Sequence, residues 1–218
     1  MLTVHAAALV VPGAAVAPLA DGAVAVDGGT VTAVGPADEL ARAHPRARTR
    51  HWPGLLTPGL AHRGASPLLE HAYHPDPREA DTLGTAPLTG TTLGTLPLDD
   101  MHWGSSARRG LQLLLRHGVT AVAGPFRRPA VRTAVARAGV VRVADGDPEA
   151  PVPSLDPLAA CSPAAAFAGT LAPGARADLA AFAVPDPAAL EETGAACCVA
   201  TVVVGRLAYR GRWDAAGR

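Results

Sequence analysis

Short apolar runs separated by turns fill the first fifty residues. The stretch "GAVAVDGGTVTAVG" alternates apolar and small residues on both sides of Gly28 and Gly29, so it predicts a β-hairpin with strands at 23–26 and 31–34. The stretch "ADELARAHPRA" at 37–47 predicts a short helix, because acidic residues stand in its first turn and a proline marks its end. The N-terminal part is therefore expected to be rich in strands.

A different, repeated order of predicted elements follows in the middle of the chain. Residues 105–124 and residues 128–146 each read as a helix, a glycine and a strand. Gly118 ends the first of these helices, and an apolar strand is expected at 140–144 after the second. Together with a possible strand at 55–60, this repetition predicts parallel βα units.

Two segments show no sustained period. Residues 61–104 are crowded with proline, glycine and threonine, so we expect a long loop that is either functional or poorly ordered. Residues 145–157 are rich in proline and acidic residues and are expected to be a linker. After them, β-rich runs return at 177–184 and at 198–213.

The order of these segments predicts an α+β fold. Each terminal set of strands is too small to fold alone, so we expect residues 1–55 and 158–218 to join in one discontinuous, small β-sandwich. Residues 56–157 are then an αβ segment inserted into that sandwich domain.

Composition narrows the possible surroundings and partners. Nineteen basic residues balance nineteen acidic ones, so no overall charge attracts nucleic acid or a membrane surface, and we expect neither as a partner. The uncharged stretch 6–20 is too short to span a bilayer and lacks the basic start of a signal peptide. Cys161, Cys197 and Cys198 form no CxxC pair, which suits a cytoplasmic protein.

Three stretches carry a family resemblance. They are "DGAVAVDGGTVTAVGPADEL" followed by "LLTPGL", "ARRGLQLLLRHGVTAV", and "SPAAAFAGTLAPGARADLAAFAV" followed by "VATVVVGRLAYRGRW". They resemble the metal-dependent amidohydrolases, in particular the imidazolonepropionase and aminodeoxyfutalosine deaminase-like branch. The resemblance implies a composite sandwich domain and a TIM-type barrel. It also implies hydrolysis of C–N bonds other than peptide bonds by a metal-bound water.

The family's first metal ligands are missing from this sequence. The resemblance implies a His-x-His pair after the "PGL" strand, where two imidazoles bind zinc or iron. The matching positions here are Gly64, Ala65 and Ser66, and His62 stands two positions early without a second histidine two residues away. We therefore expect no metal cofactor, and no catalytic residue is assigned.

The length of the inserted segment also argues against a complete, catalytic barrel. A TIM-type barrel takes at least about 200 residues, whereas positions 56 to 150 hold 95. That length suffices for about three βα units, so we expect a fragment of a barrel with open strand edges. The 61–104 loop, a second copy of the chain in a homodimer, or another protein partner is expected to cover it.

The leading hypothesis is a truncated, catalytically inactive amidohydrolase-like pseudoenzyme that acts as a binding or assembly protein. One alternative is a residual hydrolase or deaminase with a re-sited zinc or iron at His62, His71 and His74. Pro75 and Pro77 disfavour the helical turn that would bring the last two together. The other alternative is a decayed, non-functional gene product.

Overall fold

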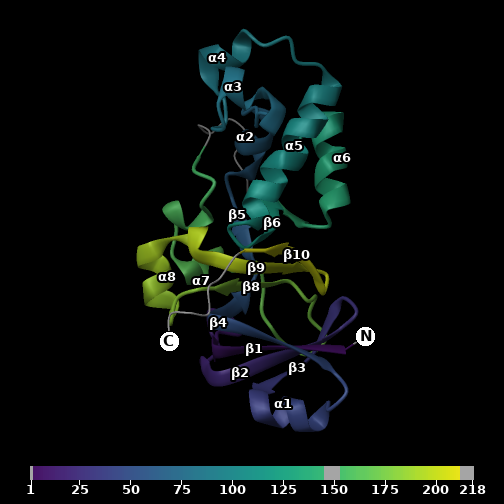
Figure 1. The fold of residues 1–218 in the computed structure, drawn as a ribbon, viewed down its shortest axis with the longest axis vertical. Helices are drawn as coiled ribbons and strands as arrows, with labels where there is room; N and C mark the ends of the chain where they lie inside the picture. Colours follow the sequence, from purple (N-terminus) through teal and green to yellow (C-terminus); the bar gives the residue numbers. More distant parts are fainter. Residues whose placement is uncertain (1, 145–152, 212–218) are drawn as a thin grey trace. The chain divides into compact units, whose positions relative to one another are not determined.

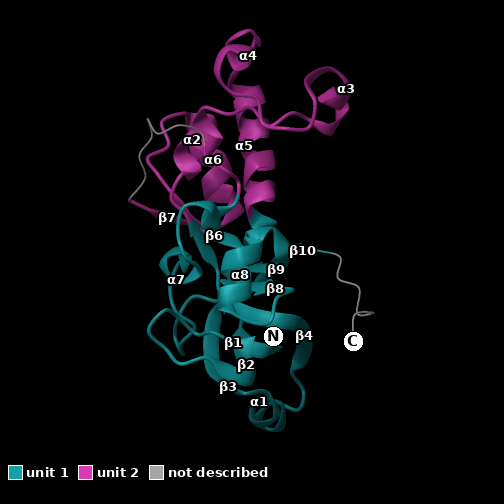
Figure 2. Ribbon diagram, turned by 90° about the vertical axis from the view of Figure 1, so that its left-hand side faces the viewer, with its two compact units in different colours: residues 1–61, 115–120, 156–218 teal, residues 62–114, 121–155 magenta. Residues whose placement is uncertain are grey.

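The chain forms two compact units (Figure 2). The computed structural model describes residues 2–144 and 153–211, so part of the linker expected at 145–157 lies outside the described residues. Unit 1 comprises residues 1–61, 115–120 and 156–218, and unit 2 comprises residues 62–114 and 121–155.

Unit 1 is built on one seven-stranded sheet (Figure 1). Its order is β10-β9-β8-β4-β1-β2-β3. The strands are β1 (Leu2–Val10), β2 (Leu19–Asp27), β3 (Thr30–Pro36), β4 (Arg48–Pro58), β8 (Leu179–Phe182), β9 (Cys198–Val203) and β10 (Arg206–Arg210). Because β4 pairs parallel to β1 and antiparallel to β8, strands from both ends of the chain join in this sheet.

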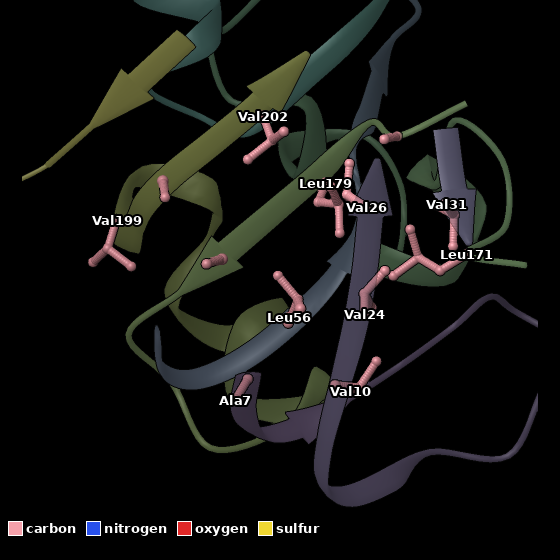
Figure 3. Close-up of a cluster of buried hydrophobic side chains, with 13 residues drawn as sticks. Ala7, Val10, Val24, Val26, Val31, Leu56, Leu171, Leu179, Val199 and Val202 are labelled. Carbon is pink, nitrogen blue, oxygen red and sulfur yellow. The ribbon is translucent and has the colours of Figure 1, made fainter. Parts of the chain in front are cut away.

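The sheet curls so that its two halves share one core. Side chains of β2 and β3 pack in the same buried cluster as those of β8 and β9 (Figure 3). Ala177 holds the two hairpin turns together, because its N–H donates to Gly29 O at 2.8 Å and its carbonyl accepts from Gly205 N at 2.8 Å. The sandwich of two sheets expected from the sequence is thus realised as a single curled sheet.

Short helices cover unit 1. Helix α1 (Ala37–Ala43) packs Leu40 against the outer face of β1 and β2, and it ends earlier than expected because His44 precedes Pro45. The other helical segments are α7 (Pro163–Ala166), α8 (Pro187–Thr193) and the 3-10 turns Pro157–Ala159 and Ala195–Cys197.

Residues 115–120 belong to unit 1, although the sequence placed them inside the barrel-like segment. The reason is close packing at Gly118, where a Cβ would lie 2.9 Å from the ring of Phe182 and 3.0 Å from Ala180. A similar contact splits the strand expected at 55–60. A Cβ on Gly59 would lie 2.0 Å from Thr120 Oγ1, and this glycine separates β4 from β5.

A small sheet with the order β5-β6-β7 carries the βα units. Its strands are β5 (Leu60–His62), β6 (Val119–Ala123) and β7 (Val141–Val143), and β6 pairs parallel to β7. Helices α5 (Asp100–Leu115) and α6 (Pro129–Ala138) precede β6 and β7, each followed by a glycine with positive φ. The repeated helix, glycine and strand expected from the sequence is confirmed.

The segment 61–104 is not the unbroken loop that we expected. It contains α2 (Ala65–Glu70), a 3-10 turn (Pro77–Glu79), α3 (Ala80–Leu83) and α4 (Gly90–Gly94). Helix α5 also begins at Asp100 rather than near residue 105, where the sequence predicted its start, because Asp99 Oδ1 accepts the His102 N–H at 2.9 Å. Among the described residues, no helix combines the length and the apolar character needed to cross a membrane.

Candidate functional site

The carboxyl end of β5 is where the family resemblance implies a metal-binding pair. Gly64 stands at the start of α2, and a Cβ added to it would lie 2.4 Å from Pro153 Cγ. Ser66 is buried, and its hydroxyl donates to Pro125 O at 2.5 Å. The space beside Gly64 is therefore filled by the chain's own proline, and the Ser66 hydroxyl serves to hold α2 to the loop after β6.

His62 lies at the last position of β5 and is buried. Its Nε2 lies 2.9 Å from Ser154 O. Because a carbonyl oxygen only accepts hydrogen bonds, the imidazole donates from Nε2. This nitrogen therefore ties β5 to the last part of the expected linker instead of pointing a lone pair at a metal.

His74 is a core residue of unit 2. Its Nε2 donates to Leu68 O at 3.0 Å, and its backbone N–H donates to Ser106 Oγ at 2.9 Å. Its carbonyl accepts from Arg109 Nε at 2.7 Å. Burial lowers the pKa of His74, so the imidazole is held neutral between α2 and α5.

The three histidines of the re-sited metal hypothesis are not assembled into one site. His71 is exposed at the end of α2, whereas His62 and His74 are buried in separate hydrogen-bonded settings. Within residues 2–144 and 153–211, no group of three His, Cys, Asp or Glu side chains is placed to hold a metal ion. As the structure places them, these three histidines do not fit a zinc or iron centre.

Glu70 is a buried carboxylate that the sequence did not single out. Its Oε1 and Oε2 accept the backbone N–H of Arg128 at 2.9 and 3.3 Å, at the start of α6. The Arg128 guanidinium lies 4.0 Å from the ring centroid of Trp103. This carboxylate therefore fixes the loop between β6 and α6, and no sequence motif identifies it because its partner is 58 positions away.

Replacing Glu70 by alanine is expected to lower the free energy of unfolding by about 2 kcal/mol, since it leaves the Arg128 N–H unpaired at a helix start. Glu70→Gln keeps an acceptor oxygen and is expected to lose about half as much. Urea unfolding followed by circular dichroism measures both variants. Equal losses for the two variants would show that the acceptor oxygen kept by glutamine does not contribute and that only the negative charge of Glu70 stabilises the loop.

A cavity of about 380 Å³ lies at the carboxyl ends of β6 and β7. Its lining residues are Gly124, Pro125, Phe126, Arg142, Val143 and Ala144. Arg142 is the charged side chain among them, and the rest of the wall is apolar or backbone. In parallel sheets, ligands bind beyond the carboxyl ends of the strands, so the predicted βα units indicate the end of the sheet at which a site can lie. The sequence does not show which strands line a cavity.

A family model matches one part of unit 1. Residues 22–47 match the imidazolonepropionase-like composite domain of bacteria, and these residues form most of β2, all of β3 and helix α1. No curated protein sequence matches the chain.

Several solved structures are similar in arrangement. The adenosine deaminase from Xanthomonas campestris, solved with bound zinc, is 23% identical, with 65% of this chain and 33% of that chain covered and a TM-score of 0.45. The guanine deaminase from Bradyrhizobium japonicum is 17% identical, with 66% and 34% covered and a TM-score of 0.46. The aminofutalosine deaminase from Helicobacter pylori is 16% identical, with 57% and 28% covered and a TM-score of 0.37.

The chain spans about a third of the length of these solved structures. The match over residues 22–47 lies in the first of the three stretches that carry the resemblance in the sequence. The resemblance is thereby confirmed for this stretch: residues 22–47 are similar to an imidazolonepropionase-like composite domain.

Proposed function

We propose that the chain is a catalytically inactive, truncated amidohydrolase-like protein that acts by binding rather than by hydrolysis. The carboxyl end of β5 is the observation that carries this proposal. The side chains there are a glycine, an alanine and a hydrogen-bonded serine, and Pro153 fills the space beside Gly64. A metal ion that activates water needs several fixed imidazole or carboxylate ligands, whereas the one imidazole at this strand end, that of His62, donates to Ser154 O.

The buried cores favour a functional protein over a decayed gene product. Unit 1 keeps a continuous apolar cluster across six of its strands, and the described residues leave only Val16, Met101 and Val204 as exposed large hydrophobic side chains. A chain without a function has no reason to retain such packing. A cooperative unfolding transition of the purified protein is the corresponding measurement.

The proposal includes a protein partner. Among the described strands, β7 stands at the end of the three-stranded sheet and has one neighbour, so its other edge is open to pairing. We propose that a second copy of the chain, or another protein, pairs with this edge. The mass of the purified protein in solution, measured at several concentrations, distinguishes a homodimer from a monomer that needs a different partner.

Metal content is the direct test of inactivity. Protein purified without a tag or chelator is expected to contain far less than one zinc or iron per chain by elemental analysis. Added zinc is expected to leave the unfolding temperature unchanged, because an ion that binds only the folded chain would raise it. About one metal ion per chain, with a higher unfolding temperature than the chelator-treated control, would overturn the proposal.

A further inference from the structure

The cavity at the carboxyl ends of β6 and β7 combines an apolar wall with a cation. Phe126, which is largely buried, forms the apolar part of this wall together with Pro125 and Val143. Arg142 is exposed on β7 and is the one charged residue among those that line the cavity. Within residues 2–144 and 153–211, no carboxylate forms an ion pair with Arg142.

The loop that forms one side of the cavity adds further positive charge. It runs from Gly124 to Arg128, and Arg132 from α6 donates to the carbonyls of Phe126 and Arg127. Glu70 is the carboxylate bonded to this loop, and both of its oxygens face the backbone N–H of Arg128. The cavity therefore lies beside a loop and a helix start that carry several arginines.

We propose that this cavity binds a small molecule that has an apolar ring and one anionic group, with the anion on Arg142 and the ring against Phe126. The volume of about 380 Å³ lies at the lower end of the range for ligand sites, which fits one ring and its substituent. A guanidinium binds carboxylate and phosphate through two parallel hydrogen bonds, so either anion satisfies the same geometry.

This inference rests on the proposed function, since it names the ligand of a protein that binds without hydrolysing. The wall beside Arg142 is apolar, and charge pairs strengthen where water is partly excluded. A neutral analogue of the same shape keeps the contact with Phe126 but loses the charge-assisted hydrogen bonds. The anionic group is therefore expected to provide most of the affinity.

Calorimetric titration of the full-length protein with benzoate and with phenyl phosphate tests the inference, with benzyl alcohol as the neutral analogue. Saturable binding of at least one anion is expected, together with much weaker binding of benzyl alcohol. Which anion binds more tightly distinguishes a carboxylate ligand from a phosphate ligand. No saturable binding of either anion, or equal binding of benzyl alcohol, would overturn the inference.

Arg142→Gln is expected to weaken binding of the anion by about tenfold or more, because it removes a charge-assisted hydrogen bond. Arg142→Lys keeps the positive charge but lacks the planar guanidinium. Its affinity for the anion should therefore lie between those of the wild type and of Arg142→Gln. Arg137→Gln is the matched control, since it removes the same charge from an exposed position at the far end of α6. Unchanged binding in folded Arg142→Gln would contradict the assignment.

Benzamide separates failure of this inference from failure of the proposed function. An active C–N hydrolase would convert it to benzoate and ammonia, so ammonia release would overturn the proposed function and, with it, the basis of the inference. If neither ammonia release nor bound metal is found and no anion binds, the ligand assignment is overturned. The proposed function then still stands.

Discussion

Gly205→Ala is expected to lower the free energy of unfolding of unit 1 by about 3 kcal/mol. Gly205 has a φ of +70°, which costs an alanine about 1 kcal/mol. In addition, a Cβ at this position would lie 1.8 Å from the carbonyl oxygen of Gly28. Backbone atoms of the two touching hairpin turns would have to move apart, at a further cost of about 2 kcal/mol. Urea unfolding followed by circular dichroism measures the loss.

Gly28→Ala is the matched control for this experiment. Gly28 also has a positive φ, of +57°, but nothing lies within 4 Å of the Cβ that the substitution adds. Its expected loss is therefore the backbone strain alone, about 1 kcal/mol. If both variants lose the same amount, contact between the two hairpin turns does not hold the curled sheet closed.

Lowering the pH from about 7 to about 4 is expected to destabilise unit 1 through His5 by about 3 kcal/mol. His5 is buried, its ring stacks on Trp52 with centroids 5.9 Å apart, and its Nδ1 accepts from Trp52 Nε1 at 3.0 Å. Burial, helped by the positive charge of Arg50, lowers the pKa of His5 from 6.5 to about 4. A protonated Nδ1 cannot accept the tryptophan hydrogen bond.

The direction of the pH effect follows from proton binding. Between pH 6.5 and about 4 the unfolded chain binds a proton at His5 and the folded chain does not. Unfolding is therefore favoured as the pH falls, and the full stability contribution is present above about pH 6.5. Each pH unit in this window changes the free energy of unfolding by about 1.4 kcal/mol.

His5→Gln isolates this contribution, because glutamine does not titrate and still accepts from Trp52 Nε1. The difference between wild-type and variant unfolding free energies should shrink as the pH falls from 7 to 4. His74 in unit 2 also has a pKa lowered by burial, so some pH dependence should remain in the variant. A difference that is constant with pH would contradict the assignment to His5.

The sequence predicted those elements whose structure depends on neighbouring residues. The hairpin around Gly28 follows from alternation and a glycine turn, and the βα units follow from amphipathic helices that end at glycines. The helical turns within 61–104 were missed because they are too short to show a period. Instead, side chains hold this segment: Tyr73 donates to Glu79 at 2.8 Å, and Arg109 pairs with Asp76 at 3.3 Å.

The candidate site was predicted only in part. Gly64 and Ser66 in place of a histidine pair are visible in the sequence, and they are the basis of the expectation that no metal binds there. The filling of that space by Pro153, and the bond between His62 and Ser154, join positions about ninety residues apart. No local pattern encodes such contacts, so these features and the cavity beside Arg142 emerge only from the folded chain.

The position of β4 in the sheet has a consequence for the nascent chain on the ribosome. Leu55 of β4 pairs with Phe182 of β8. The edge of β4 that pairs with β8 therefore has no partner strand until most of the chain has been synthesised. During that interval β1, β2, β3 and β4 form a partial sheet whose apolar edge is open to other nascent chains. Pro58 lies within that edge and offers no N–H, and it limits unwanted pairing until β8 emerges.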